Sequence, residues 1–494
     1  MSYDKNLENH NLVRLLRSLA DDEWPDYEKF VASAYFSDGR NYIPLLNAIK
    51  KHRPDFLSPE FTKEKIHAKL YGKGKYSESA INSMLSRLYR ISEDFLVQKE
   101  FENGESFYRE CLRLRALHLR GLNSKAGKHL EELSDDAGRL KFEENTFLDR
   151  KRFRREAARY IYAMNKRSEI PRALMEVLKE SVYSFLVEAF ANDFSIHTQK
   201  NFWNSDYSQS YVAKLLNCID YERILELVRE NDNVNYAFLK ICRTMALTMN
   251  DFDNDSHYAE LRKLIFDNFE TFADPFRKTS LNILALICSA KFVKGRKEFK
   301  REAFEIRKKI VDEGPFSMST SKYILLSEFR STLLEAFNEK EYEWAAKFAE
   351  KYLRRLQPEF RDDVRHYCDA MFAFSRKDFD TAVASAGKVN INQIIFKLDM
   401  KNLIAKIYYE TGSYESLLSH LNTYSQFIKN SASAGKELLQ RHKNFVNFLK
   451  GILNVILKDK DEAMLSVLRN EISSANVSAK YWLLPRIDEL LNND

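Results

Sequence analysis

A run of basic residues in the second hundred of the chain has the composition of a surface that binds a nucleic-acid backbone. The basic residues of this run are Arg150, Lys151, Arg152, Arg154, Arg155, Arg159, Lys166 and Arg167. Phe153, Tyr160 and Tyr162 lie between them, and rings among cations can stack on bases while the cations contact phosphates. Carboxylates such as Glu144 and Glu156 are interspersed, which favours the solvated face of a helix instead. Both interpretations stay open from the sequence.

The stretch from Arg361 to His366 has the sequence RDDVRH, which is the form Arg-Asp-x3-His. It resembles the active-site signature of the helical HEPN ribonucleases. The resemblance implies that Arg361 and His366 would bind the scissile phosphate and polarise the attacking ribose 2′-hydroxyl. The looser form Arg-x4-His also occurs at Arg113–His118, and both stretches fall in predicted helices, where arginine and histidine are ordinary surface residues. We therefore predict a helix surface here and no catalytic residues.

Other motifs of catalysis or metal binding are missing from the sequence. It contains no Gly-x4-Gly-Lys-Ser/Thr loop, no His-Glu-x2-His, no Gly-x-Ser-x-Gly and no Cys-x2-Cys pair. The segment Asp251–Asp255 is similar to a calcium loop, but Ser256 replaces its glycine and Arg262 its bidentate glutamate. His366 and Cys368 are two positions apart, so on a helix they point to different faces. The sequence predicts no metal site and no cofactor.

The composition predicts an all-α protein. Of the 494 residues, 44% are hydrophobic and 30% are charged, a balance typical of globular chains rather than disordered ones. The 13 glycines and 9 prolines are few for this length, which favours long helices joined by short connections. The 35 phenylalanines and 25 tyrosines suit the gaps between stacked helices, where large rings form a core.

The net charge, the cysteines and the apolar segments of the sequence limit which classes of protein it can belong to. The net charge of +6, from 78 basic and 72 acidic residues, is weaker than the clustered charge of a dedicated nucleic-acid binder. The five cysteines are widely spaced, as expected for reduced thiols. The chain opens with MSYDK and has no apolar signal core. No apolar window approaches the ~20 residues that span a bilayer. We expect a cytoplasmic protein that does not bind membranes.

Three segments in the last third share a polar turn, an aromatic residue and an apolar residue three positions later. They are Glu341–Ala345, Asp378–Ala382 and Ser413–Leu417. Their aromatic residues, Tyr342, Phe379 and Tyr414, are 37 and 35 positions apart, a period typical of arrays of helix pairs. Ala370 and Ala405 stand nine positions before the second and third aromatic residues. Small residues at these positions let the two helices of a pair approach closely.

This spacing resembles the tetratricopeptide repeat (TPR), most clearly over Ala336–Tyr424. The resemblance implies a right-handed α-solenoid whose concave face, lined by the first helix of each pair, holds a peptide or protein partner. It also implies partner-binding residues among the polar positions of those first helices. The candidates are Arg365, Asp369, Lys401, Asn402 and Lys406.

Helix stops and loops in the sequence divide the chain into three predicted parts. They are an N-terminal helical region (1–105), a charged central region of helical repeats (106–315) and C-terminal TPR-like repeats (316–494). In the first part, a short helix near Glu64–Leu70 is followed by a turn at Gly72 and a long helix after Ser77. This is the layout of a DNA-reading helix-turn-helix. A polar cap for a repeat array has the same layout.

The sequence thus predicts an all-α, right-handed solenoid of TPR-like hairpins with a helical N-terminal cap. The predicted function is a non-catalytic scaffold that binds a protein or peptide on its concave face. Two alternatives stay open. One is a nucleic-acid-binding regulator that uses the N-terminal helices or the basic run, and the other is a helical ribonuclease that uses the Arg-Asp-x3-His motif.

Overall fold

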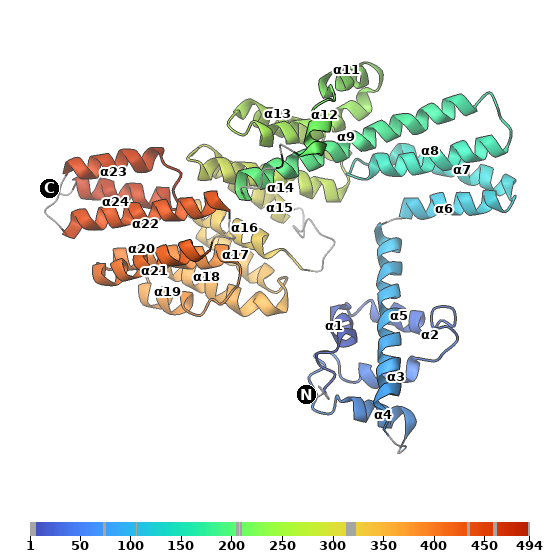
Figure 1. Ribbon diagram of the computed structural model, residues 1–494, viewed down its shortest axis with the longest axis horizontal. Coiled ribbons are helices and arrows are strands. Elements are labelled where there is room, and N and C mark those ends of the chain that lie inside the picture. Colours follow the sequence, from blue (N-terminus) through green and yellow to red (C-terminus); the bar gives the residue numbers. More distant parts are fainter. Residues whose placement is uncertain are drawn as a thin grey trace. The chain divides into compact units, whose positions relative to one another are not determined.

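The computed structural model describes residues 6–72, 76–104, 106–203, 207, 210–312, 323–431, 435–457 and 462–492. Across these ranges there are 24 α-helices and two short 3-10 helices, and β pairing is limited to two isolated bridges (Figure 1). The predicted all-α class is therefore confirmed. None of the helices in these ranges is both long enough and apolar enough to cross a membrane.

The chain forms two compact units. Unit 1 comprises Met1–Gly138 and Arg152–Ala173, and unit 2 comprises Arg139–Lys151 and Leu174–Asp494. The predicted boundaries near 105 and 315 fall on residue 105 and on residues 313–322, which lie outside the described residues. The observed division lies between them, and a short piece of unit 2 interrupts the sequence of unit 1.

Five helices form the first core of unit 1. They are α1 (Asn11–Ser18), α2 (Trp24–Ala32), α3 (Ile43–Lys50), α4 (Lys63–Tyr71) and α5 (Glu78–Gly104). Ile81, Leu85 and Leu88 recur at helical spacing on one face of α5 and are fully buried, and α5 packs against α1, α2 and α4. Tyr27 and Ser92 share a buried hydroxyl–hydroxyl hydrogen bond of 2.6 Å in this core. The core therefore fixes which face of α5 points outward.

A second core in unit 1 joins three further helices. They are α6 (Ser106–Leu119), α7 (Asn123–Arg139) and α8 (Thr146–Ala163). Cys111 and Leu114 from α6, Ala126 and Leu133 from α7, and Phe153 from α8 are buried together. Most of α8 thus belongs to unit 1, although its first turns belong to unit 2.

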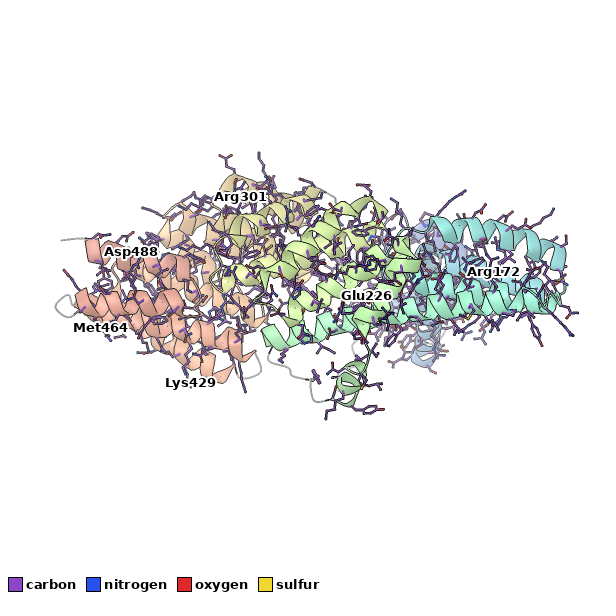
Figure 2. The ribbon with its side chains drawn as sticks, turned by 90° about the horizontal axis from the view of Figure 1, so that it is seen from above. Arg172, Glu226, Arg301, Lys429, Met464 and Asp488 are labelled. Atoms are coloured by element: carbon purple, nitrogen blue, oxygen red, sulfur yellow. The ribbon has the colours of Figure 1, made fainter. Side chains whose placement is uncertain are left out.

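Unit 2 contains the rest of the hydrophobic core and the remaining helices. They are α9 (Ile170–Trp203, from Leu174 on), α10 (Tyr211–Leu216), α11 (Tyr221–Asn231), α12 (Asn233–Asn250), α13 (Asp255–Asp267), η1 (Phe269–Thr271), α14 (Asp274–Val293), α15 (Phe299–Asp312), α16 (Leu326–Asn338), α17 (Tyr342–Leu353), η2 (Pro358–Phe360), α18 (Arg361–Ser375), α19 (Phe379–Ala386), α20 (Ile394–Glu410), α21 (Tyr414–Asn430), α22 (Lys436–Leu457), α23 (Glu462–Ser474) and α24 (Lys480–Asn492). From α11 onward each helix packs against the next one in the sequence. Figure 1 shows the last of them, α22, α23 and α24, side by side at the C-terminal end. Charged side chains such as Glu226, Arg301 and Lys429 lie on the outside of this unit (Figure 2).

The short segment that interrupts unit 1 is anchored in the core of unit 2. The N–H of Phe142 donates to the carbonyl of Thr271 at 3.0 Å, and its carbonyl accepts from the N–H of Ala273 at 2.9 Å. The Phe142 ring stacks on Phe238 with 4.9 Å between ring centroids. Phe147 packs against the same ring and is fully buried. Backbone pairing and aromatic packing together hold the segment in unit 2.

Three turns in the last third of the chain share one conformation. The residue at the centre of each turn has a positive φ: Lys340 (61°), Lys377 (62°) and Gly412 (66°). In each turn the next N–H donates, at 2.9 Å, to the carbonyl five residues earlier and closes the preceding helix. The following helices begin at Tyr342, Phe379 and Tyr414. A turn thus lies before each of the three aromatic residues, where the sequence has a polar turn.

Candidate functional site

Two of the five predicted partner-binding residues lie on an open surface. Arg365 and Asp369 are exposed one turn apart on α18. An Arg365 guanidinium nitrogen lies 2.8 Å from a carboxylate oxygen of Asp362, but both side chains are more than half exposed. Such a pair is screened by water and contributes little to stability. The two side chains are therefore free to contact a partner.

Lys401 packs against the next helix of the array. Its ammonium nitrogen lies 5.0 Å from the ring centroid of Phe427 and 5.9 Å from that of Tyr424, both on α21. The Lys401 carbonyl accepts a hydrogen bond from Nε2 of His420 at 2.9 Å. Burial lowers the pKa of the Lys401 side chain. Lys401 thus contributes to the packing of α20 on α21.

Asn402 belongs to the core, so the expectation that it lines an exposed face is corrected. Its side chain is 8% exposed. Its amide nitrogen donates to the hydroxyl of Ser478 at 2.9 Å, and its amide oxygen lies 3.0 Å from the hydroxyl of Tyr424. The Tyr424 hydroxyl also lies 2.6 Å from Nδ1 of His442. These contacts join α20, α21, α22 and the start of α24 through one buried polar network.

Lys406 is half-buried where α20 packs on α24. Its ammonium nitrogen lies 5.7 Å from the ring centroid of Trp482. Burial, opposed by the carboxylates of Asp399 and Glu410, lowers the pKa of Lys406 to about 8. Glu410 in turn accepts hydrogen bonds, each 2.9 Å long, from Nε1 of Trp482 and Nε of Arg486. The five predicted residues therefore do not form one surface, because α20 turns three of them toward neighbouring helices.

A polar layer that connects three helices was not predicted from the sequence. Arg330 on α16 donates to both carboxylate oxygens of Asp399 on α20, at 2.5 and 2.7 Å. Tyr367 on α18 donates its hydroxyl proton to the same carboxylate at 2.8 Å. The Arg330 and Asp399 side chains are each only 14% exposed. The available sequence signal was a lone aspartate between Leu398 and Met400, two apolar residues.

The basic run is divided between the two units. Arg150 lies in unit 2, where its guanidinium donates to the side-chain oxygen of Asn235 at 2.9 Å. Arg152 lies in unit 1, where its guanidinium carbon stands 4.2 Å from the ring centroid of Tyr108. Lys151, which lies between them, is half-buried. Arg150 and Arg152 thus contact partners in different units.

The rest of the run serves the core of unit 1 or faces solvent. Arg154 lies 5.5 Å from the centroid of the buried ring of Phe153. Arg159 pairs with Glu156 at 2.5 Å, and Arg155 is exposed. Of the three aromatic residues, Phe153 is in the core, Tyr160 donates its hydroxyl proton to the Asn123 carbonyl, and Tyr162 is 72% exposed.

The Arg-Asp-x3-His motif occupies the first turns of α18. Nε of Arg361 donates to the carbonyl of Leu356 at 2.9 Å, which anchors the start of the helix. His366 is half-buried and lies about 140° around the helix from Arg361. Local contacts thus account for the arginine, and the ribonuclease hypothesis stays a prediction.

The calcium-like segment is closed by basic side chains. The carboxylate of Asp255 accepts from the ammonium of Lys291 at 2.9 Å and also from Arg296. Asn254 donates to the carboxylate of Asp251 at 3.0 Å. Within the described ranges, no three His, Cys, Asp or Glu side chains gather closely enough to hold a metal ion. The segment works as a helix start, with Asn254 capping α13.

An exposed surface that these predictions did not include is a stripe of apolar side chains on α9, which we call the α9 stripe. Its members and their exposed fractions are Leu174 (51%), Met175 (64%), Leu178 (57%), Val182 (45%) and Phe185 (42%). Their spacing places them on one face of the helix, over about three turns. The opposite face is buried through Tyr183, Leu186, Val187 and Phe190. The sequence signal was a helix that is apolar on two faces, with one of the most apolar windows of the chain at Val182–Phe190.

These surfaces have to be interpreted from the residues themselves. Comparisons of the chain with protein-family models, with curated proteins and with solved structures found no match.

Proposed function

We propose that this protein is a non-catalytic interaction scaffold, in which unit 2 is a right-handed, TPR-like solenoid that binds a protein or peptide. The consecutive packing of α11–α24 and the shared turns before α17, α19 and α21 support the solenoid. The five cysteines are free thiols, which supports a reducing compartment and hence a cytoplasmic location.

The α9 stripe is the observation that carries the scaffold function. Five large apolar side chains on one helix face form a patch of the kind that marks interaction sites on folded proteins. Covering a half-exposed leucine or valine stabilises a complex by about 1 kcal/mol. Glu176 and Lys179, whose charged groups lie 3.1 Å apart, fall outside this arc of the helix. The stripe itself carries no charged side chain, and depletion of charge is typical of the centre of a protein–protein interface.

The geometry of the stripe defines the partner. A straight stripe on one helix is complementary to the apolar face of another amphipathic helix, which packs its ridges into the grooves of the first. We therefore expect a partner that presents leucine-rich or aromatic residues at three- and four-residue spacing. The exposed pair Arg365 and Asp369 is the alternative surface, because the TPR resemblance places partners there.

Affinity capture from cell extract with the full-length chain tests the proposal. The double variant Leu178→Gln/Val182→Gln removes apolar area from the stripe, and Arg365→Gln/Asp369→Asn alters the α18 surface with the same number of changes. We expect the first variant to capture about tenfold less of its main partners and the second to match the wild type. Thermal unfolding checks that both variants are folded, since exposed substitutions change stability by only about 0.5 kcal/mol.

Two outcomes would contradict this assignment. Loss of partners in the α18 variant alone would move the binding site to the face that the TPR resemblance indicates. Full retention of partners by both variants would remove both surfaces from consideration.

A further inference from the structure

The short helix α10 lacks the packing that a helix of its length requires. It has six residues and follows Ser210, whose hydroxyl accepts from the N–H of Ala213 at 3.1 Å and caps the helix. Isolated helices shorter than about 12 residues are marginal in water, and in proteins most of their stability comes from tertiary packing. None of the side chains of α10 is buried in this structure. The helix therefore needs a surface that it does not cover here.

One face of α10 is apolar and exposed. It consists of Tyr211, Val212 and Leu215, which are 78%, 59% and 53% exposed. The three positions fall within about 100° of the helix circumference. Such a face stabilises a helix only when it packs against another apolar surface. α10 is therefore itself an amphipathic helix, which is the kind of ligand that the α9 stripe is expected to bind.

The chain that follows α10 is fastened to α9 beside the α9 stripe. The ring of Tyr221, the first residue of α11, meets the ring of Phe190 edge-on with 5.1 Å between centroids. The guanidinium of Arg243 lies over both rings, at 5.2 and 5.5 Å. Phe185, the last member of the stripe, is about 7.5 Å along α9 from Phe190. The five Cα steps from Leu216, the end of α10, to Tyr221 can span about 17 Å, so α10 is held within reach of the stripe.

The connection on the other side of α10 determines the direction in which it can lie. α9 ends at Trp203 and α10 begins at Tyr211, eight Cα steps later, a span of at most about 28 Å. Along α9, Trp203 is about 27 Å from Phe185 and about 32 Å from Val182. A helix that started at Val182 and ran parallel to α9 is therefore out of reach. α10 reaches these two side chains by running antiparallel to α9, with Leu215 beside them.

Two charged residues flank the surfaces that would meet. Glu188 of α9 and Lys214 of α10 are both exposed, and neither forms an ion pair within the described part of the chain. Glu188 stands three positions after Phe185, and Lys214 stands three positions after Tyr211, so both lie on the same flank of their apolar face. In antiparallel helices packed face to face, corresponding flanks lie opposite each other. The antiparallel arrangement thus brings a carboxylate beside an ammonium.

We propose that α10 docks antiparallel on Val182 and Phe185 of the α9 stripe and there competes with an external partner helix. The competition rests on the proposed scaffold function, whereas the docking itself requires no partner. Leu227, on the helix that follows α10, is also exposed (46%), but a single apolar residue offers little area and is common on folded surfaces. The stripe offers several such residues side by side.

Hydrogen exchange of the α10 amides in the full-length chain, followed by mass spectrometry, tests the docking without any partner. We expect these amides to exchange about tenfold faster in Val182→Gln/Phe185→Gln than in the wild type, because the helix loses its packing surface. Leu227→Gln is the matched control, a change of an exposed apolar residue in the same unit, and should exchange as the wild type does. Thermal unfolding shows whether the variants are folded.

A charge exchange provides a second measurement should the double variant prove unfolded. Lys214→Glu places a second carboxylate beside Glu188, and we expect it to speed α10 exchange about twofold, the size of effect typical of an exposed ion pair. Adding Glu188→Lys restores the opposite charges and should restore the wild-type rate. Both positions are exposed, so neither change disturbs the core.

Affinity capture from cell extract separates the docking from the scaffold function. Tyr211→Ser/Leu215→Ser removes the competitor, leaves the stripe intact and should increase the capture of partners about fivefold. Unchanged capture by Leu178→Gln/Val182→Gln, with α10 still protected from exchange, would refute the scaffold function and leave the docking standing. Reduced capture by that variant, with equal α10 exchange in wild type and Val182→Gln/Phe185→Gln, would refute the docking alone.

Three further results would overturn the proposal. Faster exchange of α10 in Leu227→Gln but not in Val182→Gln/Phe185→Gln would place α10 on α11 instead. Protection of α10 that increases with protein concentration would show that it binds the stripe of a second copy. Unchanged capture by Tyr211→Ser/Leu215→Ser would show that α10 does not compete with the partner.

Discussion

The buried imidazole of His442 predicts how the stability of the protein depends on pH, and the structure gives the size of the effect. The side chain is 4% exposed, and its Nδ1 lies 2.6 Å from the hydroxyl of Tyr424 and 3.3 Å from the amide nitrogen of Asn402. Both neighbours can donate to Nδ1, so we assign the proton of the neutral ring to Nε2. A second proton on Nδ1 would face these donors. Burial, together with the charge of Arg441, lowers the pKa of His442 to about 3.

The lowered pKa of His442 determines how the free energy of unfolding changes with pH, both in direction and in size. In the unfolded chain a histidine titrates near pH 6.5, so between pH 6.5 and 3 the unfolded chain binds one more proton than the folded chain. The stability that His442 contributes is therefore complete above pH 6.5 and is lost as the pH falls toward 3. Each pH unit costs about 1.4 kcal/mol, so about 3 kcal/mol is lost between pH 7 and pH 4.

A non-titrating variant separates this effect from the carboxylates that titrate over the same range. His442→Asn removes the ring proton and lowers stability at every pH, so the comparison is with its own pH dependence. We expect the free-energy advantage of the wild type over His442→Asn to shrink by about 3 kcal/mol from pH 7 to pH 4. Urea unfolding gives the free energies, and hydrogen exchange of α20–α22 amides shows that the loss is local to the network. Parallel pH dependences in wild type and variant would refute the assignment of a neutral, buried His442.

Two further predictions concern the polar layer and the shared turns. Asp399→Asn leaves the guanidinium of Arg330 buried without its counter-charge and should cost about 3 kcal/mol in urea unfolding, whereas Asp362→Asn, at an exposed pair, should cost under about 0.5 kcal/mol; equal effects would contradict the buried pair. Lys377→Gly relieves a left-handed lysine and should stabilise unit 2 by about 1 kcal/mol, and Gly412→Ala at the equivalent turn should destabilise it by about as much, so a change of the same sign in both variants would show that the turns are not equivalent.

Residues that lie close together in the sequence were sufficient to predict the turns and the helices discussed next. The turns before α17, α19 and α21 were predicted because each consists of a few polar residues next to one another in the sequence. The predicted short and long helices near Glu64–Leu70 and after Ser77 correspond to α4 and α5 for the same reason.

Contacts between side chains that are far apart in the sequence could not be predicted from such local signals. Arg330 and Asp399 are 69 positions apart, and Asn402 and Ser478 are 76 apart. Helical periodicity indicates that Asn402 lies on a first helix, but not that a third helix covers it. Arg150 and Arg152 are only two positions apart in the basic run, yet two positions turn a helix by about 200°. The boundary between the two units also passes between them.

The insertion of Arg139–Lys151 into the sequence of unit 1 imposes an order of events during synthesis. Phe142 and Phe147 leave the ribosome early, but Phe238 and the backbone partner Thr271 are made about 100 residues later. At 5–20 residues per second this delay is on the order of 10 s, during which two aromatic rings lack their partners. A fragment that stops at residue 173 keeps the same two rings uncovered permanently. A fragment intended to contain unit 1 alone therefore needs Phe142 and Phe147 replaced by polar residues.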